Sequence, residues 1–245
     1  MKKKVNITID GKSISATPDD NIVEVAKANG VYIPTLCFYP DMGKCLGTCR
    51  VCTVKWKRHH VAACTLKVEE GMELTVQSDE LKDLRKALVE LLFVEGNHFC
   101  PGCEKSGDCK LQALGYELQM TVPRFHYRFN NRIIEYNSKK ILFEHNRCIL
   151  CKRCTHKFKD SKGRRVFFFK GKGCHLEVEM VTELVDQLNE EQVDHLVELC
   201  PVGALLKKGK GFDRPYGERK YDKTPVGQTT ETHPKPSTKK HKGLL

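Results

Sequence analysis

Residues 37–64 read CFYPDMGKCLGTCRVCTVKWKRHHVAAC and hold five of the thirteen cysteines in this 245-residue chain. Four of the five are spaced C-x11-C-x2-C-x11-C, namely Cys37, Cys49, Cys52 and Cys64. A C-x2-C pair places two thiolates on one tight loop, and a lone cysteine on either side completes the tetrahedral sites of two irons. Structural zinc is the alternative, but it commonly uses two such pairs and only one is present. The spacing therefore predicts a 2Fe–2S cluster.

The same loop contains a fifth cysteine and two glycines. Three residues separate Cys45 from Cys49, whereas a plant-type ligand pair has four, so we interpret Cys45 as a free thiol or one beside the cluster. Gly43 and Gly47 suit backbone amides that donate hydrogen bonds to cluster sulfur, which raises the reduction potential.

The residues around this loop predict a small mixed sheet over one helix. Asp10-Gly11 is a hairpin turn signal, and a helix is expected at Asn21–Asn29 with Gly30 as its C-cap. Short alternating runs predict the strands Val5–Asp10, Ser13–Ala16, Arg50–Trp56, His60–Thr65 and Glu73–Gln77. This layout is that of a plant-type ferredoxin (β-grasp) domain, which we expect over residues 1–78.

A second cysteine group follows a predicted helix. Leucines at helical spacing predict an amphipathic helix from Ser78 to Glu95 that stops at Gly96. Residues 97–109 then read NHFCPGCEKSGDC, in which three cysteines need a fourth ligand to hold a cubane cluster. An isolated histidine is more often a surface or core group, but this one stands beside an incomplete set. The predicted 4Fe–4S ligands, in a domain covering 79–120, are His98, Cys100, Cys103 and Cys109.

A third group begins with the run CILCKRC at residues 148–154. A bacterial ferredoxin would continue x3-Cys-Pro, but position 158 is Phe158, so the last ligand must come from further along the chain. Cys200 is followed by Pro201, the step that normally follows a remote cluster ligand, whereas Cys174 is not. The predicted 4Fe–4S ligands, in a ferredoxin-like domain covering 121–210, are Cys148, Cys151, Cys154 and Cys200. Cys174 stays unassigned.

Two further elements are predicted within the third domain. Asn189 and Gln192 form a capping box for a helix that runs through Leu199. Arg132–Tyr136 is a plausible strand in an otherwise strand-poor connector. Together with the domains before it, this gives an α+β fold.

Charge and composition narrow the class of protein. The formal net charge is +11, but residues 207–245 account for +7 of it, so the basic character belongs mostly to the tail. Residues 211–245 are expected to be a basic, partly disordered tail, with disorder in the last twenty residues. From the Lys-rich start we expect no signal peptide, and no apolar run approaches the roughly 20 residues that span a bilayer. We therefore expect a cytoplasmic protein.

The chain offers no site for a nucleotide or for catalysis. Gly171-Lys172-Gly173 and Gly209-Lys210-Gly211 lack the further glycine and the strand–helix context of a dinucleotide-binding loop. We expect neither NAD nor FMN to bind, and we assign no catalytic residue.

The three ligand sets, in this order, resemble the N-terminal region of the large iron–sulfur subunit of respiratory NADH dehydrogenase (complex I). They resemble more closely the small diaphorase (gamma) subunit of cytoplasmic NAD-reducing nickel–iron hydrogenases. The matching motifs are GTCRVC at 47–52, residues 98–109 with Leu111-Gln112, and CILCKRC at 148–154 with CPVGAL at 200–205. One residue separates His98 from Cys100, as in the hydrogenase subunit, whereas the complex I pattern has three. The resemblance covers residues 4–220, and the basic end after Thr224 departs from it.

The resemblance implies a hetero-oligomer in which this chain relays electrons. A flavin/NAD-binding diaphorase subunit and the small and large nickel–iron hydrogenase subunits would be its partners. The same relay would also suit an NAD-dependent formate dehydrogenase, an iron-only hydrogenase or a complex I-like enzyme. A different class, a zinc-stabilised nucleic-acid-binding protein, is disfavoured because no stacking array or recognition motif accompanies the tail.

Overall fold

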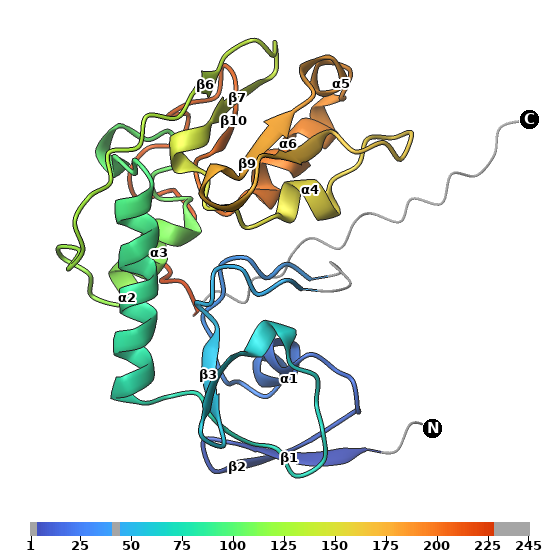
Figure 1. The fold of residues 1–245 in the computed structure, drawn as a ribbon, viewed down its shortest axis with the longest axis vertical. Helices are drawn as coiled ribbons and strands as arrows, with labels where there is room; N and C mark the ends of the chain where they lie inside the picture. The colour runs from blue at the N-terminus through green and yellow to red at the C-terminus, as the bar shows by residue number, and fades with distance from the viewer. Residues whose placement is uncertain (1–3, 41–44, 228–245) are drawn as a thin grey trace, which may run out of the picture.

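A computed structural model describes residues 4–40 and 45–227. Figure 1 shows an N-terminal lobe at the bottom and a C-terminal lobe at the top. The long helix α2 (Asp79–Glu95) runs along one side between them. Within the described residues, no helix is both long enough and apolar enough to cross a membrane.

The N-terminal lobe is a five-stranded mixed sheet with strand order β2-β1-β5-β3-β4. β1 pairs antiparallel with β2 and parallel with β5, and Ile22, Val23 and Val25 of helix α1 (Ile22–Ala28) are buried. The Asn21 side chain caps this helix by accepting a hydrogen bond from the Val23 N–H group. The strands are β1 (Val5–Ile9), β2 (Lys12–Ala16), β3 (Thr53–Trp56), β4 (His59–Ala62) and β5 (Glu73–Thr75). The predicted β-grasp architecture is confirmed.

Most of the predicted strands are shorter than the sequence pattern indicated, and the two next to the cysteines are cut by cysteine-bearing turns. β3 begins at Thr53 because Arg50 has a left-handed backbone (φ 60°) and its carbonyl accepts the Thr53 N–H. β4 ends at Ala62 because the next residues form the short 3-10 helix η1 (Ala63–Thr65), which carries Cys64. The predicted ligands Cys52 and Cys64 thus lie on turns at the strand ends.

Helix α2 has the predicted bounds. Ser78 caps it by accepting the Leu81 N–H, and the helix ends at Gly96. The turn η2 (Cys100–Gly102) and helix α3 (Lys110–Glu117) follow, and α3 starts one residue after Cys109.

The C-terminal lobe contains two small sheets. One has the strand order β10-β7-β6, with Leu205 of β10 opposite Phe143 of β7. Because β7 precedes Cys148 and β10 follows Cys200, this pairing brings the two ends of the third cysteine set together. The elements of this lobe are β6 (Ile134–Glu135), β7 (Ile141–Glu144), η3 (His145–Arg147), α4 (Arg153–Lys157), β8 (Phe167–Lys170), η4 (Gly173–His175), β9 (Glu177–Met180), α5 (Thr182–Asp186), α6 (Glu190–Leu199) and β10 (Leu205–Lys207).

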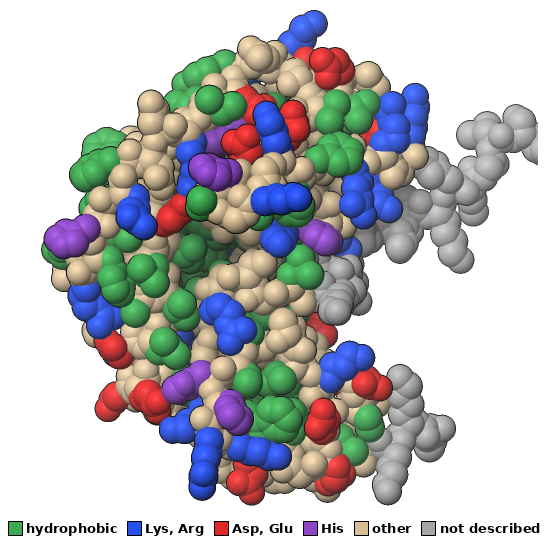
Figure 2. Space-filling model, viewed as in Figure 1, with side chains coloured by type: hydrophobic (Ala, Val, Ile, Leu, Met, Phe, Trp, Pro, Cys, Tyr) green, Lys and Arg blue, Asp and Glu red, His purple; other side chains and the backbone are tan. Residues whose placement is uncertain are grey.

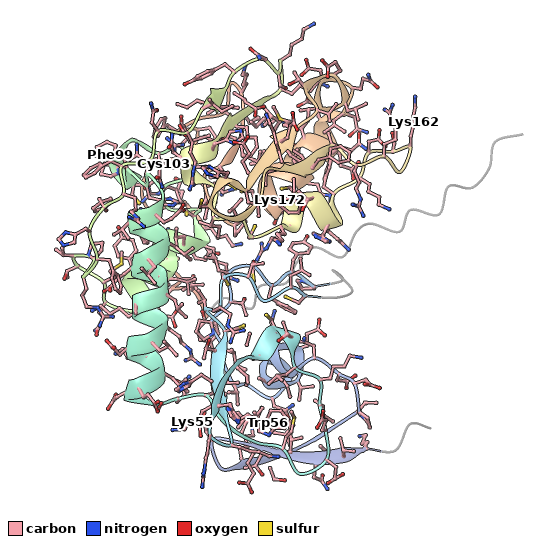
Figure 3. All side chains as sticks on the ribbon, in the orientation of Figure 1. Lys55, Trp56, Phe99, Cys103, Lys162 and Lys172 are labelled. Atoms are coloured by element: carbon pink, nitrogen blue, oxygen red, sulfur yellow. The ribbon has the colours of Figure 1, made fainter. Side chains whose placement is uncertain are left out.

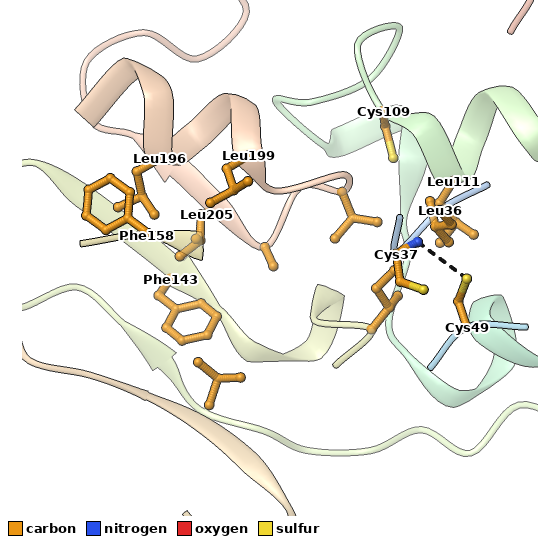
Figure 4. Packing of buried hydrophobic residues seen from close by; sticks show 14 of the residues in the cluster. Leu36, Cys37, Cys49, Cys109, Leu111, Phe143, Phe158, Leu196, Leu199 and Leu205 are labelled. Carbon is orange, nitrogen blue, oxygen red and sulfur yellow. Dashed lines mark hydrogen bonds between the residues drawn. The ribbon is translucent and has the colours of Figure 1, made fainter. Parts of the chain in front are cut away.

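The capping box predicted for α6 is present, with Asn189 and Gln192 bonded reciprocally. The predicted strand at 132–136 is reduced to the two residues of β6. A continuous apolar core runs from the first cysteine loop through α3 into the C-terminal lobe (Figure 4). A second core lies under the N-terminal sheet.

The chain returns across this body after β10. The Tyr221 N–H donates to the Gly107 carbonyl, Arg219 donates to the Ser106 carbonyl, and Val226 is buried in the larger core. Residues 211–227 therefore lie against the cysteine loop of 100–109. The disorder expected for the last twenty residues concerns mostly residues 228–245, which lie outside the described part of the chain, as does Gly43.

One buried arginine joins the two lobes. The Arg153 guanidinium donates to the carbonyls of Leu36 (2.6 Å), Phe38 (2.5 Å) and Cys37 (3.3 Å) in the first cysteine loop. It also donates to the Leu199 carbonyl (3.2 Å) at the end of α6. Among the described residues, no carboxylate forms an ion pair with it. Its charge is therefore solvated by backbone carbonyls from two lobes.

We expect the substitution Arg153→Met to lower the melting temperature strongly. It leaves four carbonyls unsatisfied in the interior, and unpaired buried acceptors cost about 1–3 kcal/mol each before relaxation. At about 2–4 °C per kcal/mol for a chain of this size, the loss should be roughly 10 °C by calorimetry.

Arg85→Met is the matched control for this variant. Arg85 is also buried, but its guanidinium donates to a single carbonyl, that of Thr53. We expect a clearly smaller loss of melting temperature. Equal losses in the two variants would contradict the role of Arg153 as the link between the lobes.

Candidate iron–sulfur sites

The first predicted set is buried at the top of the N-terminal lobe. The Cys37 N–H donates to Cys49 Sγ at 3.3 Å, as Figure 4 shows, and the Cys64 N–H donates to Cys52 Sγ at 3.5 Å. All four cysteines are buried. Amide N–H groups that point at sulfur stabilise a thiolate, so the backbone is already arranged for ligand sulfurs.

The sulfur atoms of this set are close enough to alter one another's ionisation. Hydrogen bonds from the thiols of Cys45, Cys49 and Cys64 hold the pKa of Cys37 far below its usual range. The same contacts raise the pKa of Cys64, chiefly through Cys37. Because neighbouring thiolates repel each other, one ionises first, and further ionisation requires a cation to offset the charge.

The structure also brings Cys45 to this set. The Sγ atoms of Cys37, Cys45 and Cys64 all lie within 4.8 Å of one another. Of the two roles that the sequence left open for Cys45, a free thiol or one beside the cluster, this position agrees with the second. Gly47, with φ +61°, allows this loop to pack closely against Thr65, because a Cβ at residue 47 would lie 2.8 Å from Thr65 Cγ2.

The second predicted set lines a small cavity beside the upper end of α2, where Figure 3 labels Phe99 and Cys103. The four side chains that face this cavity as candidate ligands are those of His98, Cys100, Cys103 and Cys109. Among the described residues, buried His98 Nε2 has no hydrogen-bond partner. Burial, together with the charges of Arg147 and Arg132, lowers the pKa of His98 to about 4.

A neutral imidazole with an unpartnered nitrogen, aimed into a cavity with three thiols, fits a metal ligand. Burial of such a nitrogen without a partner costs free energy, and a metal bond would satisfy it. Burial also raises the pKa of the Cys109 thiol to about 12, so this thiol releases its proton only when metal binds. The donor chemistry therefore suits a 4Fe–4S cluster.

Two glycines allow the close packing around the second set. A Cβ at Gly96 would lie 2.5 Å from His98 Nε2, and a Cβ at Gly203 would lie 2.8 Å from Cys103 Sγ. Real Cβ atoms essentially never approach that closely, so either side chain would displace a candidate ligand. Gly203 belongs to the segment that follows Cys200, so the second and third sets are packed together.

We expect Gly203→Ala to reduce the content of the second cluster, because the added methyl group pushes Cys103 Sγ aside. Overpacking of this kind costs about 1–3 kcal/mol. Iron per chain and the EPR signal of the second cluster would measure the loss. Gly115→Ala in α3 is the control, since its Cβ would meet only ordinary contacts at 3.5 Å or more. Full cluster content in the Gly203 variant would contradict the steric argument.

The third predicted set lines another small cavity, at the N-terminal end of α4. Its four cysteines are Cys148, Cys151, Cys154 and Cys200. Burial raises the pKa of Cys148 and of Cys151 to about 12. Cys174 lies apart from them, exposed on the turn η4 between β8 and β9. The structure thus brings Cys200, and not Cys174, to the CILCKRC loop.

The loop of the third set is wound tightly. Leu150 (φ 49°) and Lys152 (φ 65°) both have left-handed backbones on either side of Cys151. Non-glycine residues in this region cost of order 1–3 kcal/mol each and persist only where the surroundings hold them. With this backbone conformation, the side chains of Cys148, Cys151 and Cys154 all line one cavity.

Hydrogen bonds join the segments of the third set to residues beside each of the other two sets. Arg153, next to Cys154, donates to the Cys37 carbonyl of the first set. On the other side, the Lys110 N–H next to Cys109 donates to the Pro201 carbonyl at 3.0 Å. A residue next to a third-set cysteine is thus hydrogen-bonded to the segment of each of the other two sets.

Comparison with known proteins identifies the family. Family models match residues 2–79 (2Fe–2S iron-sulfur cluster binding domain), 85–124 (NADH-ubiquinone oxidoreductase-G iron-sulfur binding region) and 138–206 (NADH-quinone oxidoreductase subunit 3, ferredoxin-like domain). The gamma subunit of the NAD-reducing hydrogenase HoxS of Cupriavidus necator is 49% identical over 219 residues, 89% of this chain and 93% of that subunit. The chain belongs to the family of NAD-reducing hydrogenase gamma subunits.

The remaining comparisons agree with membership of the gamma-subunit family. A crystal structure of an NAD+-reducing [NiFe]-hydrogenase in the H2-reduced state matches with a TM-score of 0.84 and 36% identity, over 92% of this chain and 96% of that one. The mitochondrial 78 kDa subunit of NADH-ubiquinone oxidoreductase from Candida albicans is 30% identical, but the chain spans only 29% of its length. The predicted fold class and the predicted cofactors, one 2Fe–2S and two 4Fe–4S clusters, are confirmed. The twelve individual ligands and the domain bounds stay predictions.

Proposed function

We propose that this gamma-subunit family member passes electrons between a flavin/NAD(H) diaphorase subunit and a nickel–iron hydrogenase module. The observation that carries the proposal is that one chain holds three thiol-lined sites, and that hydrogen bonds join the segments which carry them. We assign no catalytic residue to the chain, which would serve as a non-catalytic part of a hydrogen:NAD oxidoreductase. One-electron centres of this kind accept and release electrons without bond chemistry at the protein.

We further propose twelve ligands for the three clusters. Cys37, Cys49, Cys52 and Cys64 would hold the 2Fe–2S cluster. His98 with Cys100, Cys103 and Cys109 would hold one 4Fe–4S cluster, and Cys148, Cys151, Cys154 and Cys200 the other. Support comes from the convergence of each group on one buried site and from the unpartnered His98 nitrogen. The corresponding domains would span 1–78, 79–120 and 121–210, followed by a tail.

The contacts between the sites also support an order for the relay. Residues next to third-set cysteines are hydrogen-bonded to the segments of both other sets, Arg153 to the Cys37 carbonyl and the Pro201 carbonyl to the Lys110 N–H. Because electron tunnelling falls off with distance, we propose that the third cluster carries electrons between the first and the second.

Exposed apolar side chains support a place within a hetero-oligomer. Figure 2 shows hydrophobic side chains over the side of the molecule where the connector after α3 runs in Figure 1. Phe129 is 86% exposed, and Val122, Tyr127, Ile133 and Tyr136 are exposed beside it. Surfaces of this kind are typical of contacts between subunits.

We place the assembly in the cytoplasm.

Purification of the whole complex without oxygen tests this function. We expect about ten irons per gamma chain (2 + 4 + 4), negligible zinc and hydrogen-dependent reduction of NAD. Nickel in the complex would accompany this result. Molybdenum or tungsten with formate-dependent activity would instead assign the chain to a formate dehydrogenase. Zinc in place of iron would overturn the relay function altogether.

We expect His98→Cys to keep a 4Fe–4S cluster but to lower its midpoint potential. A thiolate in place of a neutral imidazole adds one negative charge, which disfavours the reduced cluster. An EPR-monitored redox titration measures the shift, with His126→Cys on the exposed connector as the control. An unchanged potential and spectrum would remove His98 from the ligand set.

Replacement of Cys200 by Ser should damage the third cluster, because oxygen is a poorer ligand than sulfur for this iron site. The same replacement at Cys174, an exposed thiol, should leave all three clusters intact. Cluster-resolved EPR signals and iron content distinguish the two. The reverse pattern would assign the ligand to Cys174.

A further inference from the structure

Cys45 is outside the proposed twelve-ligand set, yet its sulfur lies at the first site. Its Sγ is within 4.8 Å of the Sγ atoms of both Cys37 and Cys64. Two thiolates bound to one tetrahedral metal at about 2.3 Å lie roughly 3.8 Å apart. The three sulfurs therefore occupy a space similar to the ligand shell of a single metal ion.

The position of Cys45 relative to the four proposed ligands is specific. Backbone hydrogen bonds join the proposed ligands into two pairs, Cys37 with Cys49 and Cys52 with Cys64. Cys45 lies against one member of each pair. It is therefore within reach of an iron bound by either pair, and adjustment of a short side chain would suffice.

The backbone that carries Cys45 is packed against the segment of Cys64. Gly47, two residues later, is so close that a Cβ there would lie 2.8 Å from Thr65 Cγ2 and 3.9 Å from Cys64 Sγ. A cysteine side chain has a single rotatable bond to its sulfur, so its reach is set by this backbone. The proximity of Cys45 to Cys64 thus follows from the packing of the loop.

We propose that Cys45 is a reserve ligand of the 2Fe–2S cluster, able to replace Cys64 or Cys37. This inference rests on the proposed 2Fe–2S site at residues 37–64. In the exchange, the bond from iron to Cys64 sulfur breaks and a bond from iron to Cys45 sulfur forms. The proton of the Cys45 thiol moves to the released Cys64 thiolate. The iron oxidation states and the total charge do not change.

The alternative role for Cys45 is a thiol that only donates a hydrogen bond to a ligand sulfur. The two roles differ when a ligand is lost. A reserve ligand keeps the cluster in the protein after Cys64 is removed, whereas a hydrogen-bond donor cannot. Removal of Cys45 alone would shift the potential in either case, so the decisive variants combine both positions.

The test uses the full chain produced within its complex and purified without oxygen. The variants are Cys64→Ala, Cys45→Ala/Cys64→Ala and Cys64→Ala/Cys174→Ala, and the readouts are iron content and the EPR signal of the 2Fe–2S cluster. We expect the first and third variants to keep the 2Fe–2S signal with altered g values. We expect the double variant without Cys45 to lose it. The 4Fe–4S signals report correct folding in every sample.

Three results would overturn the proposal. One is loss of the 2Fe–2S signal in Cys64→Ala while the 4Fe–4S signals persist. Another is retention of the signal in the double variant without Cys45. The third is loss in the control that lacks Cys174 but keeps Cys45. A wild-type complex without any 2Fe–2S signal would instead contradict the proposed function, so the two failures are distinguishable.

If Cys64→Ala does not fold, Cys64→Ser fills nearly the same space and answers the same question. A reserve thiol should outcompete the serine oxygen for iron and give the absorption and EPR spectra of four thiolate ligands. Additional removal of Cys45 should then convert them to the spectra of a cluster with one oxygen ligand. Identical spectra with and without Cys45 would refute the exchange.

Discussion

Groups of buried sulfur atoms that face one another impose the main constraint on this structure. Thiolates packed this closely repel each other, and burial raises the pKa of several of them to about 12. Only a cationic core can hold them together as ligands, so binding of the clusters releases protons and organises the loops at once. The sheets and helices around them serve mainly to bring these loops into position. Loss of iron should therefore affect folding as well as electron transfer.

At the third site, several structural features hold together the cysteines whose repulsion the cluster core offsets. Leu150 and Lys152, which have left-handed backbones, shape its loop. Its fourth cysteine, Cys200, directly follows the C-terminal end of α6. The pairing of β7 with β10 brings the two ends of the segment between Cys148 and Cys200 together. The Arg153 guanidinium then donates to the Leu36 carbonyl of the first cysteine loop. The strained turn, the sheet closure and the buried charge therefore support one another. A substitution that disrupts the third site should therefore destabilise both lobes, because Arg153 is hydrogen-bonded to carbonyls of each.

Much of this organisation could be predicted from the sequence, because metal ligands are constrained in type and spacing. The β-grasp strands, the bounds of α2 and the capping box at Asn189 follow from local patterns. The choice of Cys200 rested on a single proline, and the structure brings Cys200 to the third set through a strand pair that no local pattern indicated. For Cys45 the spacing to Cys49 left two interpretations open, a free thiol or one beside the cluster. The structure places its sulfur beside those of Cys37 and Cys64, a position that depends on the tertiary contact of Gly47 with Thr65.

The ends of the proposed relay differ from its middle in a way that suits electron transfer between subunits. Phe99, beside the second set, is 67% exposed, and Leu46, next to Cys45 in the first loop, is also exposed. Large apolar side chains beside the proposed cluster sites would let a partner approach closely while water is excluded, which would shorten the tunnelling distance and lower the reorganisation of solvent. The third set, enclosed between Arg153 and Pro201, has contacts within the chain instead. In the proposed relay, an electron that enters at one exposed end would pass through the interior to the other.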